Sequence, residues 1–349
     1  MQIQQLAISR NKLYALIALA GLVAFPAFFP PSWVLFAMIV VLSDAIVILG
    51  FNILVGYAGI AFLIPLFFMA IGAYSAGWLS VNTALHPFIS IIIGGIITII
   101  SSFLFSLVST KVKGWFMGLY SFVMFFLIGT LAIQQEEFIY AWTGGPFGII
   151  DIPDIILPMG IAMRDFEGAP YYYLFLGILA VSAFGTFKMM YRSNLGLAIR
   201  SVKENDLLAE QLGVNPLRTK IYVFVIASFL MGISAAAMSH FLGSAVPFKY
   251  FSINELIHYH FELITGGLGS FTGPVVGSFM MIFYDEIMIY YPPYYLMFKG
   301  LLITLTLLFL PLGVMGEVER RIFKMQSETR LTFPILLIAK YVKKTFKKS

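Results

Sequence analysis

The segment NELIHYHFEL (254–263) carries ionisable side chains inside an otherwise apolar stretch. On a helix Glu255, His258 and Glu262 fall on one face, at offsets of three and four, while His260 points elsewhere. Glu255 and His258 also have the Glu-x-x-His spacing of carboxylate-bridged metal sites, but the chain offers no second ligand set at like spacing. We expect this face to pair between helices or to line a permeation path, and we expect no metal ion.

Asp44 stands alone in another apolar stretch, and the same two roles, pairing or path, remain open for it. The rest of the chain is poor in catalytic groups, with no cysteine and only four histidines. Neither an assembled nucleophile nor an acid–base pair can be recognised. We therefore expect neither an enzyme nor a bound cofactor.

The elements that position these residues are apolar helices. Hydrophobic residues make up 60% of the chain and charged residues 11%, which is typical of a polytopic membrane protein. Taking about twenty residues per crossing, we predict an all-α transmembrane bundle with ten spans, at roughly 13–29, 33–55, 58–79, 88–109, 115–133, 171–190, 221–243, 252–265, 273–289 and 294–312.

Basic residues orient these spans in the cell membrane. Placing both termini in the cytoplasm puts most lysines and arginines inside, as the positive-inside rule requires. The loop at about 134–170 is then external, and it holds six acidic residues against one arginine. The net charge of +5 thus serves orientation, and no nucleic-acid partner is expected.

Two predicted spans are interrupted by glycine and proline, in GYAGIAFLIPLFFMAIGAY (56–74) and GGLGSFTGPVVGS (266–278). Irregular backbone at membrane depth is tolerated where it is buried in protein or lines an aqueous cavity. Close helix packing and a permeation path both remain open. The candidate path residues in these segments are Gly56, Tyr57, Gly59, Gly72, Gly266, Gly267 and Gly269.

The longest charged stretch is RSVKENDLLAEQLGVNPLRTK (200–220). Ser201 and Glu204 have capping-box spacing, Gly213 follows the last periodic residue, and Pro216 forbids continuation, which predicts one helix of about three turns.

Its two faces differ in polarity. Leu208 and Leu212 share the apolar face, and Lys203, Asp206 and Glu210 take water-facing positions. The residues alone leave two roles open, an interfacial helix resting on headgroups or a helix that docks a cytoplasmic partner.

The stretch YRSNLGLAIRSVKENDLLAEQLGVNPLRTKIYVFVIASFLMGISAAAMSHFLG resembles the cytoplasmic loop and following span of the branched-chain amino-acid ABC importer permeases. GFNILVGYAG with AIGAY, KVKGWFMGLYS followed by TGGPFGIIDIP, and GGLGSFTGPVVG are similar to further blocks of that family. Together the four blocks cover about Leu35 to Gly316, and residues 1–316 are interpreted as one permease domain.

The resemblance implies that residues 191–220 form a coupling loop that seats on a separate ATP-binding subunit, since the chain has no phosphate loop of its own. It further implies a second permease subunit, an extracytoplasmic solute-binding protein that could dock on the acidic loop, and a small amino-acid-like substrate. The implied coupling residues are Ser201, Glu204, Asn205, Leu208, Ala209, Leu212 and Gly213.

The chain departs from the family pattern at Ile60, Phe62, Ile64 and Pro65, where family members carry a glutamine, a serine and a glycine-histidine pair. Phe126 stands in place of an acidic residue, and Ser121 in place of a threonine. If those groups touch substrate in relatives, this protein accepts something more apolar or uses other contacts, among them Ser121. The alternative function is an ion-coupled secondary transporter of a small solute, but no clear inverted repeat is visible.

The segment from residue 317 to 349 lies outside the resemblance. It ends in FPILLIAKYVKKTFKKS, where an apolar face adjoins five lysines. This pattern predicts a basic amphipathic tail on anionic cytoplasmic lipid.

Overall fold

The computed structural model describes residues 21, 23–26, 32–83, 85–109, 112, 114, 116–134, 137–157, 161–166 and 168–321. Most of these residues are helical, as the sequence predicts. The chain divides into two compact units, Met1–His260 and Phe261–Ser349.

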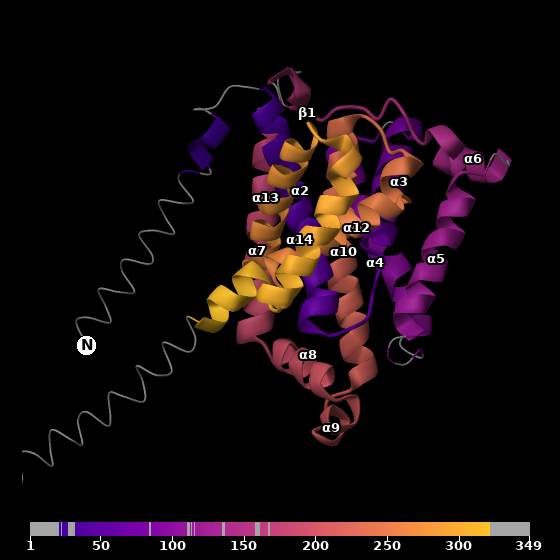
Figure 1. Ribbon diagram of the computed structural model, residues 1–349. Helices are drawn as coiled ribbons and strands as arrows, with labels where there is room; N and C mark the ends of the chain where they lie inside the picture. Colours follow the sequence, from indigo (N-terminus) through magenta and orange to yellow (C-terminus); the bar gives the residue numbers. More distant parts are fainter. Residues whose placement is uncertain are drawn as a thin grey trace, which may run out of the picture. The chain divides into compact units, whose positions relative to one another are not determined.

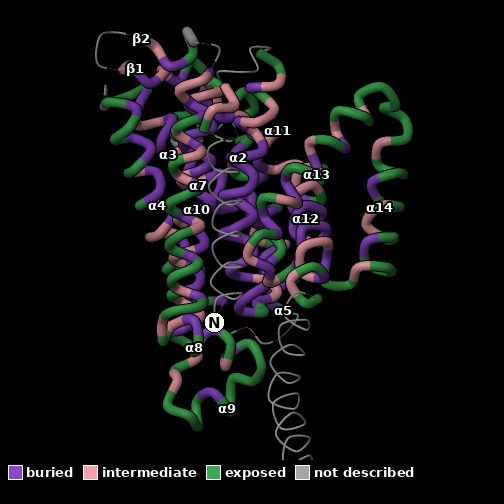
Figure 2. The backbone as a smooth tube through the Cα atoms, turned by 90° about the vertical axis from the view of Figure 1, so that its left-hand side faces the viewer, coloured by how far each residue is buried: buried purple, intermediate pink, exposed green. Residues whose placement is uncertain are grey.

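The centre of the first unit consists of α2 (Ser32–Asn52), α3 (Pro65–Asn82), α4 (Pro87–Ser109) and α10 (Pro216–Leu242). Helices α3, α4 and α10 pack against one another, and α2 packs against α10 and against α7 (Ala169–Arg192) (Figure 1). The whole second half of α2 is buried (Figure 2). A helix that is apolar on all sides buries itself in this way.

Helices α3 and α10 approach closely because glycines face each other. A Cβ atom added at Gly72 would lie 2.3 Å from the carbonyl oxygen of Gly232. Small residues at such a crossing allow the two backbones to touch. Close packing, one of the two roles that the sequence left open, therefore accounts for Gly72.

The other elements of the first unit are shorter. A π-helix, η1 (Ile53–Tyr57), continues α2, and α5 (Phe116–Ala132) follows α4. The loop after α5 contains α6 (Glu137–Thr143), η2 (Gly145–Phe147), the antiparallel pair β1 (Ile156–Leu157) and β2 (Ile161–Ala162), and η3 (Met163–Phe166). Helices α8 (Asn194–Glu204) and α9 (Asp206–Gln211) lie beyond the ends of α7 and α10 (Figure 1), and α11 (Pro247–Tyr250) follows α10.

Helix α12 (Ile253–Gly266) leads into the second unit, which contains α13 (Gly273–Met288), η4 (Pro292–Tyr294) and α14 (Tyr295–Phe309). Residues 313–321 are also helical. Phe261, Met281 and Tyr284 form a small core, against which Tyr295 and other partly buried side chains pack.

In the described residues, five segments are long and apolar enough to cross a membrane: Ser32–Tyr57, Pro87–Ser109, Ala169–Arg192, Pro216–Leu242 and Pro292–Arg321. The protein is therefore multi-pass. The count of ten spans stays a prediction, and most of the span predicted at 13–29 lies outside the described residues, as does the tail after residue 321. The span predicted at 58–79 was wrong at its start, because residues 59–64 are not helical and α3 begins at Pro65.

Candidate functional site

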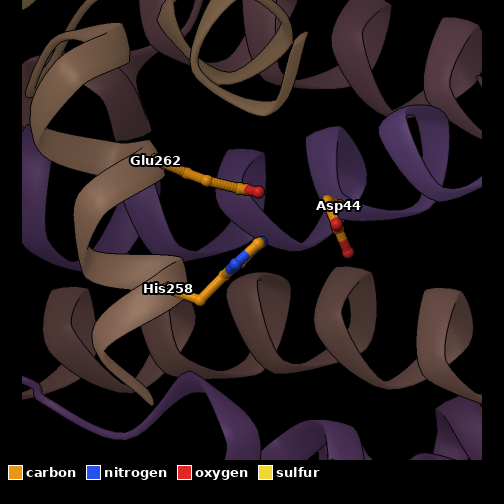
Figure 3. A group of neighbouring side chains, drawn as sticks. All are labelled: Asp44, His258 and Glu262. Atoms are coloured by element: carbon orange, nitrogen blue, oxygen red, sulfur yellow. The ribbon is translucent and has the colours of Figure 1, made fainter. Parts of the chain in front are cut away.

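Asp44 lies in the buried half of α2, with 6% of its surface exposed. The hydroxyl of Tyr259, on α12, donates a hydrogen bond of 3.0 Å to the Asp44 carboxylate. A ring nitrogen of His258 lies within 4.8 Å of an Asp44 carboxylate oxygen (Figure 3). The structure thus brings together Asp44 and His258, two of the residues that the sequence singled out.

Two further residues near this polar cluster are His260, which lies apart from it, and Lys249, which is close to it. His260 turns away, as predicted, and its ring meets Phe51 edge-on at 5.1 Å. Lys249, on α11, is half-buried. Desolvation lowers the pKa of Lys249, and the nearby carboxylates of Asp44 and Glu255 oppose that shift. Both signs of charge therefore occur around Asp44.

Glu262 projects from the same side of α12 as His258 (Figure 3) and belongs to the second unit. It is fully buried, and Ser278 on α13 donates a hydrogen bond of 3.1 Å to its carboxylate. A Cβ atom at Gly277 would lie 2.2 Å from the carbonyl oxygen of Glu262. Glu262 is thus held where α12 and α13 are in close contact.

The glycine-rich loop between Gly266 and Gly273 connects α12 to α13. A Cβ atom at Gly266 would lie 2.2 Å from the carbonyl oxygen of Gly273, so close packing explains Gly266. Gly267 and Gly269 have positive φ angles of 125° and 74°, which favour glycine. The Glu319 carboxylate accepts hydrogen bonds from the amides of Phe271 and Thr272, just before α13, and so holds the end of this loop.

The glycine-containing segment that begins at Gly56 follows α2. Gly56 and Tyr57 belong to the π-helix η1 and are buried, and Gly59, with φ of 65°, turns the chain into the non-helical segment 59–64. The Ser121 hydroxyl accepts a hydrogen bond of 3.2 Å from the Leu63 amide. Ser121 thereby attaches this segment to α5, a structural role that the sequence did not indicate.

Phe62 occupies one of the positions where the family resemblance predicts a polar residue. It is fully buried, stacks on Phe68 at 5.4 Å and meets Phe105 and Phe224 edge-on at 5.8 and 5.7 Å. An aromatic cluster therefore lies between the segment 59–64 and helices α3, α4 and α10.

The charged stretch forms two helices, so the prediction of one helix was wrong. Helix α8 is capped by Ser193, whose hydroxyl accepts from the Gly196 amide at 3.2 Å. Helix α9 is capped by Asn205, whose side chain accepts from the amides of Leu207 and Leu208. The predicted capping box was also wrong, because Ser201 lies inside α8 and its hydroxyl donates to the Ala198 carbonyl.

The apolar residues of the two helices face different surroundings. In α8, Ile199 and Val202 are buried, whereas in α9 only Ala209 is. Leu208 and Leu212 lie on the exposed side, at 58% and 79% exposed. Glu204 is exposed as well.

The end of the stretch agrees with the sequence. Gly213 has a φ of 83° and ends the helical turn, and Asn215 caps α10, with Pro216 in its first turn.

Lys203 is exposed, as predicted. Its Nζ atom nevertheless donates a hydrogen bond of 2.7 Å to the carbonyl of Gly56 in η1, a contact that the sequence did not indicate. Asp206 is also exposed, as predicted, and pairs with Lys220 at 2.5 Å. A cavity of about 570 Å³ opens beside Lys203, and sequence reasoning gave no signal of it.

One acidic residue of the loop at about 134–170 has a structural role. Asp154 accepts from the Arg164 amide at 2.8 Å and from the Tyr171 hydroxyl, so it ties the loop to α7. Asp151 is exposed, with a φ of 57°.

Long apolar helices, a buried polar cluster and a polar arm between two spans define a multi-pass transport protein rather than a soluble binding module. The family described as "Branched-chain amino acid transport system / permease component" matches residues 32–310, and the chain belongs to it. This family consists of transport permease components and is not an enzyme family.

Curated relatives agree with this membership. The chain is 23% identical over 287 residues to the high-affinity branched-chain amino acid transport system permease protein LivM of Salmonella typhimurium and 24% identical to that of Escherichia coli. Both alignments cover 76% of this chain and 66% of the relative, so the match spans less than two thirds of those proteins. A shorter match, 31% over 129 residues, covers 36% of this chain and 32% of the xylose transport system permease protein XylH of Escherichia coli. No solved structure matches the chain significantly.

Proposed function

We propose that this chain is the membrane-spanning permease subunit of an ABC importer for branched-chain or other small amino acids in the cell membrane. The observation that carries the proposal is the family match, which extends from α2 to α14. ATP hydrolysis is assigned to a separate subunit.

The proposal includes three partners, and family membership together with the arm formed by α8 and α9 supports the first of them. An ATP-binding subunit seats on α9, where Leu207, Leu208 and the C-cap residue Leu212 are exposed apolar side chains. A second permease subunit completes the membrane path, and an extracytoplasmic solute-binding protein delivers substrate to the loop at 134–170. When the ATP-binding subunit closes, it shifts the permease toward the conformation that it binds more tightly, and the arm transmits this shift.

The substrate contact is assigned to the cluster around Asp44. An amino acid carries an ammonium and a carboxylate, so its path through an apolar bundle needs fixed charges of both signs. Asp44 offers a buried carboxylate beside Tyr259 and His258, and Lys249 supplies a positive charge nearby. The other predicted path residues stay part of this proposal: Gly56, Tyr57, Gly59, Gly72, Ser121, Glu255, Glu262, Gly266, Gly267 and Gly269.

The test is uptake of radiolabelled leucine by proteoliposomes that contain the complete transporter and its solute-binding protein. We expect uptake to require internal ATP and to resist a protonophore. Uptake that the protonophore abolishes and ATP depletion spares would instead establish the ion-coupled carrier. In the same assay Asp44→Asn should weaken uptake at limiting leucine while ATP hydrolysis without substrate stays unchanged, and unaltered uptake would remove Asp44 from the path.

A further inference from the structure

The side chain of Lys203 connects α8 to η1, the π-helix that continues α2, 147 residues away in the sequence. Its Nζ atom donates a hydrogen bond of 2.7 Å to the carbonyl oxygen of Gly56. This is a direct contact between the arm and a membrane helix, made by one extended side chain. A movement of α8 therefore has a defined point at which it acts on α2.

The acceptor lies where the backbone of α2 changes geometry. The π-helix Ile53–Tyr57 ends with hydrogen bonds of 3.1 Å from the Ala58 amide to the Ile53 carbonyl and 3.0 Å from the Ile60 amide to the Leu54 carbonyl. Carbonyl groups at a helix end lack partners in the next turn, and the helix dipole places partial negative charge there. An ammonium group is well suited to such a position.

The aliphatic part of Lys203 also fits the chain that it crosses. Gly59 has a φ of 65°, and a Cβ atom there would lie 3.0 Å from the Cγ of Lys203. Glycine at this position therefore provides both the left-handed turn and the space for the lysine stem.

The cavity of about 570 Å³ is bounded by the two segments that Lys203 joins. Gly59, Ile60 and Ala61 line one part of it, and the α8–α9 junction lines another. Phe224 also lines the cavity, and it packs on Phe62 at 5.7 Å in the aromatic cluster. The segment 59–64, which follows the lysine contact directly, thus packs Phe62 against a residue of the cavity wall.

We propose that Lys203 is the positioning residue through which the arm moves the segment 59–64, so that displacement of α8 opens or closes the path at the aromatic cluster. This inference rests on the proposed function, because it requires a partner that displaces the arm. When α8 moves, the Lys203 contact pulls on the Gly56 carbonyl. The turn at Gly59 then shifts Phe62 relative to Phe224.

The experiment uses the complete transporter in proteoliposomes and exploits the absence of cysteine from this chain. A single cysteine, Ala61→Cys, places a thiol on the cavity wall. Its labelling rate with a thiol reagent is measured with and without ATP, beside ATP hydrolysis and leucine uptake. The variants are Lys203→Met, Lys203→Arg and, as a matched control, Lys220→Met, since Lys220 lines the same cavity but pairs with the exposed Asp206.

We expect Lys203→Met to lower leucine uptake per ATP hydrolysed by about tenfold, which corresponds to loss of a charge-assisted hydrogen bond. It should also abolish the ATP-dependent change in labelling. Lys203→Arg should restore most of both, and Lys220→Met should behave as the parent protein. The inference is overturned if Lys203→Met keeps the ATP-dependent labelling change, or if Lys220→Met loses it equally.

A folding defect is separated by a second variant. Gly59→Ala leaves Lys203 in place but crowds its stem, and it should reduce the labelling change in the same direction. An unchanged labelling response in Gly59→Ala, with Lys203→Met absent from the membrane, would count against the inference. If the parent protein shows an ATP-dependent labelling change but takes up no leucine, the proposed substrate fails and the role of Lys203 stands.

Discussion

Helices α8 and α9 come from one charged stretch of sequence but differ in how they bury their apolar side chains. In α8, Ile199 is fully buried and Val202 nearly so, and the Arg200 guanidinium donates to the Met190 carbonyl on α7. In α9, Leu208 is more than half exposed, and most of this helix is exposed (Figure 2). The first helix is anchored to the bundle, whereas the second presents apolar surface.

This difference separates two tasks that a single docking helix would have to combine. A rigid element can transmit motion only if it is packed against what it moves, and a docking surface must be free to contact a partner. The break at Asn205 allows both, since each helix turns its apolar side chains in its own direction. The arm thus has an anchored root in α8 and an exposed tip in α9.

The largest expected effect tests the anchored root. Ile199→Ala should destabilise the protein by about 2–5 kcal/mol, because it removes buried methyl groups and leaves a cavity. Leu208→Ala at the tip should change stability by no more than about 0.5 kcal/mol, because its side chain is already exposed. Thermal unfolding of the purified transporter in detergent measures both, and equal shifts in the two midpoints would mean that root and tip do not differ.

A second pair of changes tests the tip. Leu208→Asp combined with Leu212→Asp should lower ATP-dependent leucine uptake by at least about tenfold, because a docked interface tolerates buried, unpaired charge poorly. Thermal stability should hardly change, since both side chains are exposed.

The matched control for the tip is Leu197→Asp, an equally apolar and exposed position on α8. Uptake by this variant should stay close to that of the parent protein. A loss as large as that of the double variant would place the docking surface on both helices, and full uptake by the double variant would remove it from α9.

The sequence predicted most helices because the apolar runs are long and glycine or proline marks their ends, as Pro216 does for α10. It also contained the signal for the break in the arm, since asparagine followed by aspartate at 205 and 206 is typical of a helix start. The Ser201–Glu204 pair had the same kind of pattern, and local spacing could not rank the two. Packing of Val202 against the bundle favours a continuous helix through Ser201.

The contacts of the candidate site could not be predicted in this way. Lys203 follows the polar periodicity of its helix, but its acceptor at Gly56 lies 147 residues earlier. Likewise Tyr259 lies 215 residues from Asp44. Sequence periodicity indicates which residues share a face, and it carries no information on which distant backbone group that face meets.

The smallest expected effect concerns the break itself. Asn205→Ala removes the acceptor for the Leu207 and Leu208 amides and should cost about 1 kcal/mol of local stability. Hydrogen exchange of these two amides should then become about fivefold faster. Asn205→Asp should preserve the cap, because aspartate is an equally good acceptor at this position. Ser201→Ala is the decisive comparison. If the Leu207 and Leu208 amides lose more protection in Ser201→Ala than in Asn205→Ala, the stretch is one helix capped at Ser201. If they lose protection only in Asn205→Ala, the stretch must be two helices.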